Sequence, residues 1–322
     1  MPTPPFAPFE PFPGLSSGWL QTVFGSLMPG NTQVPARKRH QVPLAGEGVM
    51  VAYEIVPSAP TRPVVLMTHG MGGCSESPYM RRIARKLHGE GVGVFMLNQR
   101  GSGPGMGLSP TLWNGGSSED FSRGVDFLAR LHPRSPILLM GFSLGGNVLL
   151  KYLGEGRPVP DRVIGAYAVN PPVDLRRSSQ ILSERLWLFN RYYMRLIRRQ
   201  AEMLARCFPG ARRPPANAKT IWEFDAAYTA PAAGFRDAEE YYARSSSGQY
   251  LAAIGVPTTI LCSKDDPFIP PEVFEGLAMS GSLEFHAPEK GGHMGYISRQ
   301  PTREGDRRWM DAALVEWVLA RA

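Results

Sequence analysis

The fold of this 322-residue chain is decided by the stretch Ile137-Leu138-Leu139-Met140-Gly141-Phe142-Ser143-Leu144-Gly145-Gly146-Asn147. Its first half is an apolar run typical of a buried strand, and a helical pattern follows it. The two halves meet at a G-x-S-x-G turn, where bulk at either glycine would clash with neighbouring backbone. Such a turn lifts the serine hydroxyl above the sheet and points a helix N-terminus at any anion formed there. We predict that Ser143 is a nucleophile. The alternative is a plain glycine-rich turn, since a chain with 35 glycines contains this pattern by chance more easily.

Strand and helix patterns alternate on both sides of this stretch. Strands are predicted at 49–56, 64–67, 92–97, 137–140, 163–169, 258–262 and 283–286, and helices at 78–88, 119–131, 145–153 and 307–319. Alternating β and α units imply a mostly parallel sheet covered by helices on both faces. Together with the serine turn, this pattern predicts the α/β-hydrolase fold.

Two segments depart from the alternation. Residues 1–13 hold six prolines and are predicted to form an extended N-terminal arm. The stretch from about 174 to 250 is longer, more basic and more aromatic than the rest. An interruption late in such a chain predicts a helical cap over the carboxyl ends of the strands, where ligands bind. We therefore expect one hydrolase domain, residues 14–322, with the cap inserted at about 174–250.

A base for Ser143 is expected downstream, because a serine hydroxyl is a weak nucleophile without one. In this fold the acid and then the histidine follow the serine. Only His286 and His293 lie after Ser143. His286 falls inside the apolar run 283–286 and is therefore a strand residue, whereas His293 follows two glycines on the next loop. We predict His293 as the base; the alternative is a surface loop histidine.

The acid is expected on the loop after the strand at 258–262, where Asp265 and Asp266 are adjacent. In many proteins of this fold the loop carries an aspartate with a proline four residues later, and Asp266 with Pro270 fits that spacing. We favour Asp266 as the group that orients the imidazole and stabilises the imidazolium. Asp265 is then a structural or solvated neighbour.

Two backbone N–H groups are predicted to stabilise an oxyanion. One belongs to Leu144, the residue after the serine, and the other to Met71 on the loop His69-Gly70-Met71-Gly72-Gly73 after the first buried strand. His69 has the side chain of a catalytic residue. Its place directly before a glycine favours support of the loop over a direct chemical role.

The composition is that of an ordinary soluble globular protein, with 43% hydrophobic and 20% charged residues. The N-terminus lacks the basic and apolar regions of a signal peptide, which favours the cytoplasm. Three cysteines form no disulfide or zinc pattern. The glycine-rich stretch 101–107 does not fit G-x-G-x-x-G, and no P-loop or H-E-x-x-H motif is present. We expect no cofactor and no metal, and we interpret 101–107 as a flexible loop at the rim of the active site.

The net charge of +7 raises the question of nucleic-acid binding. Much of the excess lies between 185 and 213, among many apolar residues and without a nucleic-acid-binding motif, so we expect no nucleic-acid partner. From 182 to 213 the apolar residues follow helical spacing, and six arginines accompany them: Arg185, Arg191, Arg195, Arg198, Arg199 and Arg206. The favoured interpretation is a cap helix with a solvated face. The alternatives are a lid that contacts an acidic or phospholipid surface, and a partner-binding helix.

Several motifs together resemble the YheT-like group of α/β-hydrolases. They are Trp19-Leu20-Gln21-Thr22, 68–73, 141–155, 170–175, Glu223-Phe224-Asp225, 228–231, 265–268 and Gly291-Gly292-His293. The chemistry of Trp19–Thr22 does not follow from spacing alone. The resemblance covers residues 14–300 and implies a triad of Ser143, Asp266 and His293, with carboxylesterase activity on short or medium acyl chains. The chain departs from the group at 113–120, at the expected rim of the pocket.

These features predict the cleavage of carboxylic esters through an acyl-enzyme, with a small-molecule ester or a lipid as substrate. Three alternatives stay open. An acyltransferase would use the same residues with an alcohol acceptor, a phospholipase would dock lipid through the basic cap segment, and a binding protein on this fold would usually lack one member of the triad.

Overall fold

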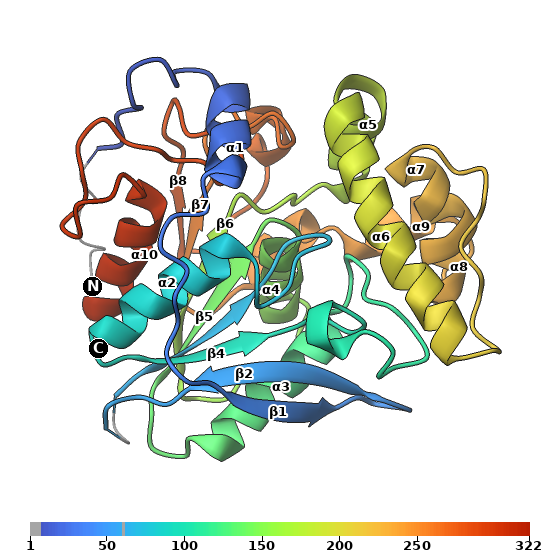
Figure 1. Cartoon of the computed structure of the whole chain (residues 1–322), viewed down its shortest axis with the longest axis horizontal. Coiled ribbons are helices and arrows are strands. Elements are labelled where there is room, and N and C mark those ends of the chain that lie inside the picture. The colour runs from blue at the N-terminus through green and yellow to red at the C-terminus, as the bar shows by residue number, and fades with distance from the viewer. Residues whose placement is uncertain (1–7, 60–61) are drawn as a thin grey trace.

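The computed structural model describes residues 8–59 and 62–322 and contains an eight-stranded sheet in the order β1-β2-β4-β3-β5-β6-β7-β8 (Figure 1). The strands are β1 (Lys38–Pro43), β2 (Val49–Ile55), β3 (Val64–Thr68), β4 (Gly93–Leu97), β5 (Ile137–Phe142), β6 (Val163–Val169), β7 (Thr258–Leu261) and β8 (Leu283–His286). The six strands from β4 to β8 run parallel, while β2 is antiparallel to both of its neighbours. The mostly parallel sheet is therefore confirmed. Residues 1–7 of the predicted N-terminal arm lie outside the described residues.

Alternating strand residues pack into two separate cores, one on each face of the sheet. Leu66 faces the core built with α3 (Ser118–Leu131) and α4 (Leu144–Gly154). Its neighbour Met67 faces the core built with α2 (Pro78–Gly89) and α10 (Trp309–Leu319). Because neighbouring side chains of a strand point to opposite faces, an unbroken apolar run means that both faces are covered. This is why β3, β4 and β5 are fully buried.

Outside the segment between β6 and β7, one strand and one α-helix have no counterpart among the predicted elements. β1 is a polar edge strand in which only His40 and Val42 are buried, so its hydrophobic signal is weak. The other is α1 (Gly18–Leu27), whose N-terminus is capped by the Ser17 hydroxyl accepting the N–H of Leu20. Among the described helices, none is both long and apolar enough to cross a membrane.

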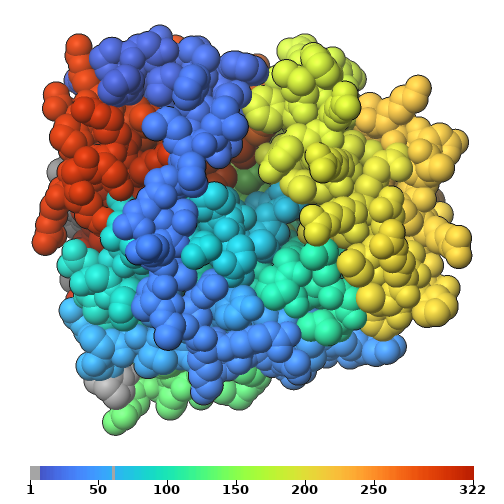
Figure 2. Space-filling view, in the orientation of Figure 1, coloured from blue at the N-terminus to red at the C-terminus, as the bar shows by residue number. Residues whose placement is uncertain are grey.

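Helices fill the chain between β6 and β7. Before the short 3-10 helix η3 (Gly248–Ala253), they are α5 (Leu175–Arg185), α6 (Trp187–Cys207), α7 (Ile221–Phe224), a π turn η2 (Asp225–Thr229), α8 (Ala230–Ala232) and α9 (Ala238–Ser245). They gather at one side of the sheet in Figure 1 and form the yellow mass beside the core in Figure 2. We propose that this segment is the cap expected at about 174–250.

The cap sequence from 182 to 213 is not one helix. It breaks at Leu186, whose ψ of 54° is not helical, and α6 ends at Cys207. Periodicity continued across the break because apolar residues on both sides face the same interior. Leu182 of α5 belongs to the core beneath α3 and α4, and Phe189 and Tyr193 of α6 pack against the same core.

Candidate active site

Ser143 lies on a sharp, strained turn between β5 and α4. Its φ of 50° is in the left-handed region, which a side chain with a Cβ rarely adopts. The turn needs the flanking glycines, as the pattern predicted. A Cβ on Gly141 would lie 2.5 Å from the carbonyl oxygen of Gly145, and one on Gly145 would lie 2.6 Å from that of His69. The close packing of backbone against backbone therefore holds the serine in this strained conformation.

The structure brings Ser143, His293 and Asp266 into one hydrogen-bonded chain. His293 Nε2 lies 2.8 Å from Ser143 Oγ, although 150 residues separate the two in sequence. Its other ring nitrogen, Nδ1, lies 2.8 Å from Asp266 Oδ2. His293 and Asp266 are both buried. A nucleophile, a base and a group that orients the base lie at the distances that acyl transfer requires.

Four donors hold the Asp266 carboxylate. Its Oδ1 accepts the backbone N–H groups of Phe268 (2.8 Å) and Ile269 (3.2 Å). Its Oδ2 accepts Asn170 Nδ2 at 2.6 Å as well as His293. Asn170 follows β6 and has a φ of 45°. Asn170 begins the family motif at 170–175, and no role in the site was predicted for it from the sequence.

Asp265 points to a different partner. Its Oδ1 accepts the N–H of Gly292 at 2.9 Å, so it ties the acid loop to the glycine loop that carries His293. This is the structural neighbour expected of Asp265. His286, the other histidine considered, ends β8 with a half-exposed side chain 3.8 Å from Glu284.

The stretch Trp19-Leu20-Gln21-Thr22, which spacing alone did not explain, lies on α1 behind His293. Thr22 Oγ1 accepts the backbone N–H of His293 at 2.8 Å and donates to the carbonyl of Gly18 at 2.6 Å. The contact is close enough that a Cβ on Gly292, at φ +61°, would lie 2.2 Å from the Gly18 oxygen. Gly18 also packs on the backbone of Asp265. One N-terminal helix therefore supports both the acid loop and the histidine loop.

The loop after β3 passes directly over Ser143. A Cβ on Gly70 would lie 3.0 Å from Ser143 Cβ and 3.2 Å from the Phe142 carbonyl oxygen, so a larger residue would push the loop away from the serine. Met71 follows it and lines the same pocket as Ser143 and Leu144. Leu144 is the first residue of α4, where backbone N–H groups have no partner within the helix. Both predicted oxyanion donors thus belong to backbone beside the serine hydroxyl.

His69 supports this loop from below. Its Nε2 accepts the N–H of Gln99 at 3.1 Å, and its Nδ1 donates to the carbonyl of Gly70 at 2.8 Å. Burial lowers the pKa of His69 to about 4, with the Gly70 hydrogen bond opposing that shift. The imidazole is therefore neutral near pH 7. This geometry agrees with the expected role of loop support.

A pocket opens between the serine and the cap. It holds about 1020 Å³ of empty space, its open mouth included, and its walls are mostly apolar and aromatic. On the core side lie Leu144 and Phe268, whose ring meets His293 edge-on at 4.6 Å. On the cap side lie Leu182 and Ile197.

Trp113, in the stretch that departs from the YheT-like pattern, lines the pocket and donates its indole N–H to Gln200 on α6 at 2.9 Å. By contrast, the interpretation of 101–107 as the rim is wrong. None of these residues lines the pocket, because the short turn Gly103–Gly105 packs beside Cys74 and β2 instead.

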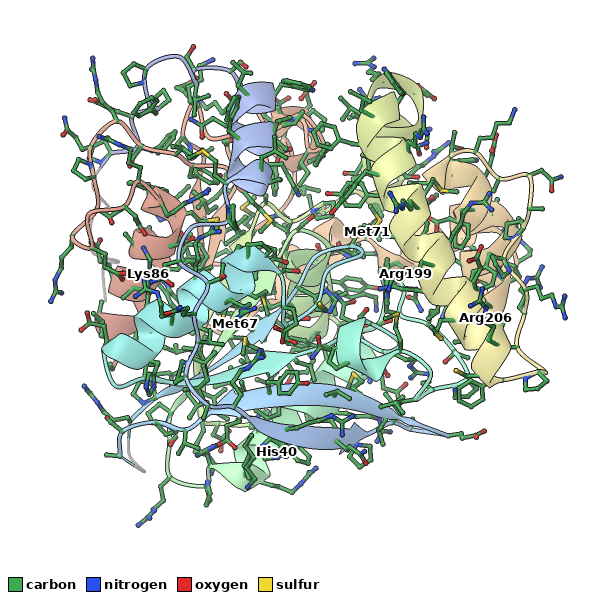
Figure 3. All side chains as sticks on the ribbon, viewed as in Figure 1. His40, Met67, Met71, Lys86, Arg199 and Arg206 are labelled. Carbon is green, nitrogen blue, oxygen red and sulfur yellow. The ribbon has the colours of Figure 1, made fainter. Side chains whose placement is uncertain are left out.

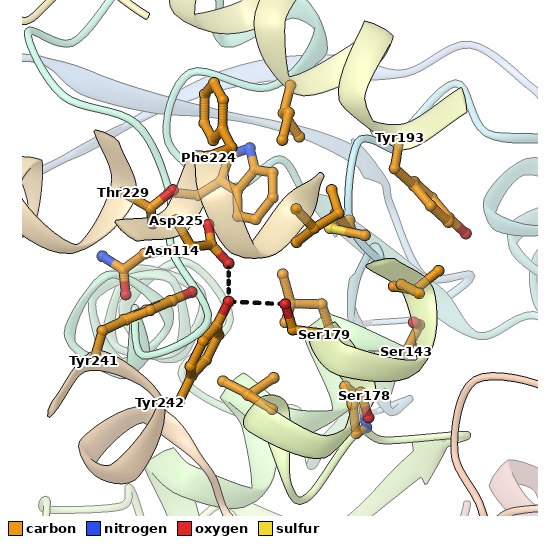
Figure 4. Close-up of a pocket in the computed structure, with 18 of the residues that line it drawn as sticks. Asn114, Ser143, Ser178, Ser179, Tyr193, Phe224, Asp225, Thr229, Tyr241 and Tyr242 are labelled. Atoms are coloured by element: carbon orange, nitrogen blue, oxygen red, sulfur yellow. Dashed lines mark hydrogen bonds between the residues drawn. The ribbon is translucent and has the colours of Figure 1, made fainter. Parts of the chain in front are cut away.

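The inner end of the pocket is polar. Tyr242 donates its hydroxyl to Asp225 Oδ2 at 2.8 Å, and Ser179 Oγ lies 2.8 Å from the same hydroxyl oxygen. Figure 4 shows this group on the far side of the pocket from Ser143. Asp225 ends the family motif Glu223-Phe224-Asp225, and no role in the site was predicted for it from the sequence. A lone carboxylate in a cap helix carries no signal in the sequence that would place it in a pocket.

Comparison with known proteins points to the same fold. The profile described as "alpha/beta hydrolase fold" matches residues 63–300. The Escherichia coli (strain K12) protein named "Putative esterase YheT" is 28% identical over 97% of this chain and 93% of its own, which confirms the resemblance to that group. "Phospholipase ABHD3" of Bos taurus is 27% identical over 81% of this chain, which spans only 64% of that relative.

Solved structures show the same fold at lower identity. The Pyrococcus furiosus esterase Pf2001 superposes with a TM-score of 0.57 and 15% identity, covering 88% of this chain and 91% of its own. The eight-stranded order, the serine turn and the profile match over most of the chain lead to one conclusion. The chain belongs to the α/β-hydrolase fold family.

Proposed function

We propose that the protein hydrolyses carboxylic esters through Ser143, His293 and Asp266. The observation that carries the proposal is the hydrogen-bonded chain from Ser143 Oγ through both ring nitrogens of His293 to Asp266, set at one side of an apolar pocket. The relatives named as an esterase and a phospholipase support ester chemistry in general. The fold family by itself fixes no reaction, so we infer the reaction from the residues of the site.

In the first step, Ser143 Oγ attacks the ester carbonyl carbon while its proton passes to His293 Nε2. The carbonyl oxygen becomes an oxyanion that accepts the N–H groups of Met71 and Leu144. One such donor is typically worth about 3 kcal/mol of barrier. As the carbonyl reforms, the bond to the alcohol breaks, and His293 returns the proton to the leaving oxygen. Asp266 stabilises the imidazolium in between.

In the second step, water takes the place of the alcohol. His293 accepts a proton from water as its oxygen attacks the acyl carbon, the same N–H groups bind the second oxyanion, and Ser143 leaves with the proton that His293 gives back. The carboxylic acid is released and the enzyme returns to its starting state. The two steps use the same residues in the reverse order of proton transfer.

The apolar walls of the pocket favour an apolar acyl chain, because apolar surface gains free energy by leaving water. The proposed short to medium length is what the resemblance to the YheT-like group implies. The test is the hydrolysis of p-nitrophenyl esters of graded chain length by the wild type and by Ser143→Ala. Activity and fluorophosphonate labelling are expected for the wild type alone. An inactive, unlabelled wild type would refute the serine-hydrolase proposal, and an active Ser143→Ala variant would refute the assignment of the nucleophile.

A specific observation on α6 favours phospholipase action as the second candidate. Trp187, Leu188 and Tyr192 are exposed at the start of the helix, and exposed arginines follow, with Arg199 and Arg206 visible along α6 in Figure 3. Exposed apolar residues beside arginines are typical of a helix that lies on an anionic lipid surface. We propose this face as the site of peripheral membrane contact.

Sedimentation with vesicles containing anionic phospholipid tests this second candidate. The wild type is expected to co-sediment, and binding is expected to fall in a variant combining Arg191→Glu, Arg195→Glu and Arg199→Glu. Arg303→Glu, an exposed arginine outside the cap, serves as the matched control. Equal binding by the triple variant and the control would contradict a docking role for α6.

A further inference from the structure

Asp225 stands apart from the other buried carboxylates of the protein. Five are buried in the part of the chain that the structure describes: Glu54, Asp120, Asp225, Asp266 and Asp311. The other four each bond a basic side chain. The pairs are Glu54 with His40 and His132, Asp120 with Arg100, Asp266 with His293, and Asp311 with Arg82. Among the described residues, Asp225 alone of these five forms no ion pair. A buried carboxylate without a counter-ion is expensive, so its presence calls for a partner.

The partners that Asp225 does have are hydroxyl groups. Tyr242 donates to Oδ2, and the Ser179 hydroxyl meets Tyr242 in turn. Burial raises the pKa of Asp225 to about 6, against the opposing effect of hydrogen bonds from Thr229 and Tyr242. The carboxylate is therefore substantially ionised at pH 7, and two hydroxyl donors do not neutralise its charge.

The surroundings of Asp225 suit a cation. Tyr228, Tyr241 and Tyr242 line this end of the pocket, and the last two rings lie 5.0 Å apart. Aromatic faces attract ammonium groups, most strongly where water is excluded. Among the described residues that line the pocket, none is a lysine or an arginine. The carboxylate therefore meets the pocket with no competing positive side chain.

The same pocket joins this end to the serine. Figure 4 shows Ser143 on one side of the pocket and Asp225 and Tyr242 on the other. His293 and apolar side chains such as Ile197 and Ile221 line the same pocket. A ligand that fills the pocket would have an ester at one end, an apolar middle and a group recognised by Asp225 at the other.

We propose that the inner end of the pocket is a subsite for an alkylammonium group, so that the preferred ester carries a protonated or quaternary amine at the far end of an apolar chain. This inference rests on the proposed function for the ester at the Ser143 end of the ligand, and on Asp225 for the ammonium group at the opposite end. The subsite disfavours substrates with a carboxylate or phosphate in that position, because like charges would meet in a poorly solvated space.

Binding, rather than turnover, tests the subsite, so that it succeeds or fails independently of the esterase proposal. Isothermal titration calorimetry is carried out on the full-length Ser143→Ala protein with n-hexylammonium, 1-hexanol and hexanoate. These share one chain and differ in the charge of the head. We expect hexylammonium to bind about tenfold more tightly than hexanol, as a charge-assisted hydrogen bond in a dry site allows, and hexanoate to bind more weakly than both.

Asp225→Asn in the same background is expected to bring hexylammonium and hexanol to within about twofold of each other, since the amide keeps the shape but not the charge. Ser178→Ala is the matched control, because Ser178 lines the pocket and has no hydrogen bond to the Asp225 group. It should retain the preference. Equal binding of hexylammonium and hexanol with Asp225 intact would overturn the subsite even if the asparagine variant failed to fold. An intact preference in Asp225→Asn would overturn it as well. An ammonium preference in a protein without esterase activity would refute only the proposed function.

Discussion

The two sides of the pocket are built in opposite ways. On the core side, Asp266 receives four donors and passes a hydrogen bond through His293 to Ser143, so its charge has a partner within the chain. On the cap side, Asp225 receives hydroxyl donors only and stays without an ion pair among the described residues. The backbone on the core side is also held by close contacts at glycines.

The core side is a site whose charged group already has an ion-pair partner in the protein, whereas the charged group on the cap side has none among the described residues. The core side holds a reactive group in a strained position, and its surroundings over-determine that position. The cap side holds a charge that its surroundings do not balance, which leaves an interaction for a ligand. We therefore expect substitutions on the core side to act on turnover, and substitutions at Asp225 to act on ligand choice and on pH-dependent stability.

The largest expected effect separates the two adjacent aspartates. Asp266→Asn should lower kcat by about 10⁴-fold, because the amide no longer holds the imidazole in the required tautomer. Asp265→Asn keeps an acceptor for the Gly292 N–H and should lower kcat by less than about tenfold. Steady-state kinetics on a p-nitrophenyl ester measures both. A larger loss in Asp265→Asn than in Asp266→Asn would reverse the assignment of the acid.

The next effect concerns the backbone contacts at the serine turn. Gly145→Ala places a Cβ 2.6 Å and 2.7 Å from the carbonyl oxygens of His69 and Thr68. We expect the free energy of unfolding to fall by about 3 kcal/mol, since the backbone must shift to admit the methyl group. Chemical denaturation measures the change. Gly255→Ala, where a Cβ would meet nothing within 4 Å, is the control and should change little.

Asp225→Asn should stabilise the protein in a pH-dependent way. Burial raises the pKa of Asp225 from 3.8, its value in the unfolded chain, to about 6 in the folded protein. The folded state therefore binds the proton more tightly, and this stabilising contribution is fully present below pH 3.8. That contribution is lost as the pH rises to the folded value. The asparagine variant should therefore gain stability over wild type, on the order of 2 kcal/mol, between about pH 4 and pH 7. Denaturation at both pH values measures the difference.

Glu54 provides the opposite case for that measurement. Hydrogen bonds from His132 and His40 outweigh the effect of burial and lower its pKa, so its contribution is present above the unfolded value and is lost on acidification. Glu54→Gln should become less stable than wild type as the pH rises past about 4.5. If the stability difference of Asp225→Asn did not change with pH, the unbalanced charge in the cap would be disproved.

The smallest expected effect tests α1. Thr22→Val removes the acceptor of the His293 N–H and should lower kcat about tenfold with KM nearly unchanged, because the base is displaced while the pocket is not. Thr22→Ser keeps the hydroxyl and should restore most of the rate. A change in KM alone, or no recovery with serine, would show that Thr22 acts only through packing.

Local patterns predicted the elements that bear strong signals. Seven of the eight strands lie where the sequence predicted them. β2 to β7 are largely buried, and a strand covered on both faces has a nearly unbroken hydrophobic pattern, whereas β8 is a partly exposed edge strand. β1 was not predicted, because this edge strand carries mostly polar, exposed residues. The break at Leu186 was not predicted, because an apolar stripe can continue from one helix into the next when both helices cover the same core.

The order of motifs along the chain by itself determined the fold class and predicted Ser143 and His293. It narrowed the acid to Asp265 or Asp266, and the proline spacing and the family resemblance then favoured Asp266. These predictions were available because parallel strands bring successive loops to one edge of the sheet. Only the tertiary structure decided which residues stand behind them: Thr22 on an N-terminal helix, Asn170 after β6, and Asp225 across the pocket. These contacts span up to 271 residues and depend on how separate elements pack, and no local spacing encodes such packing.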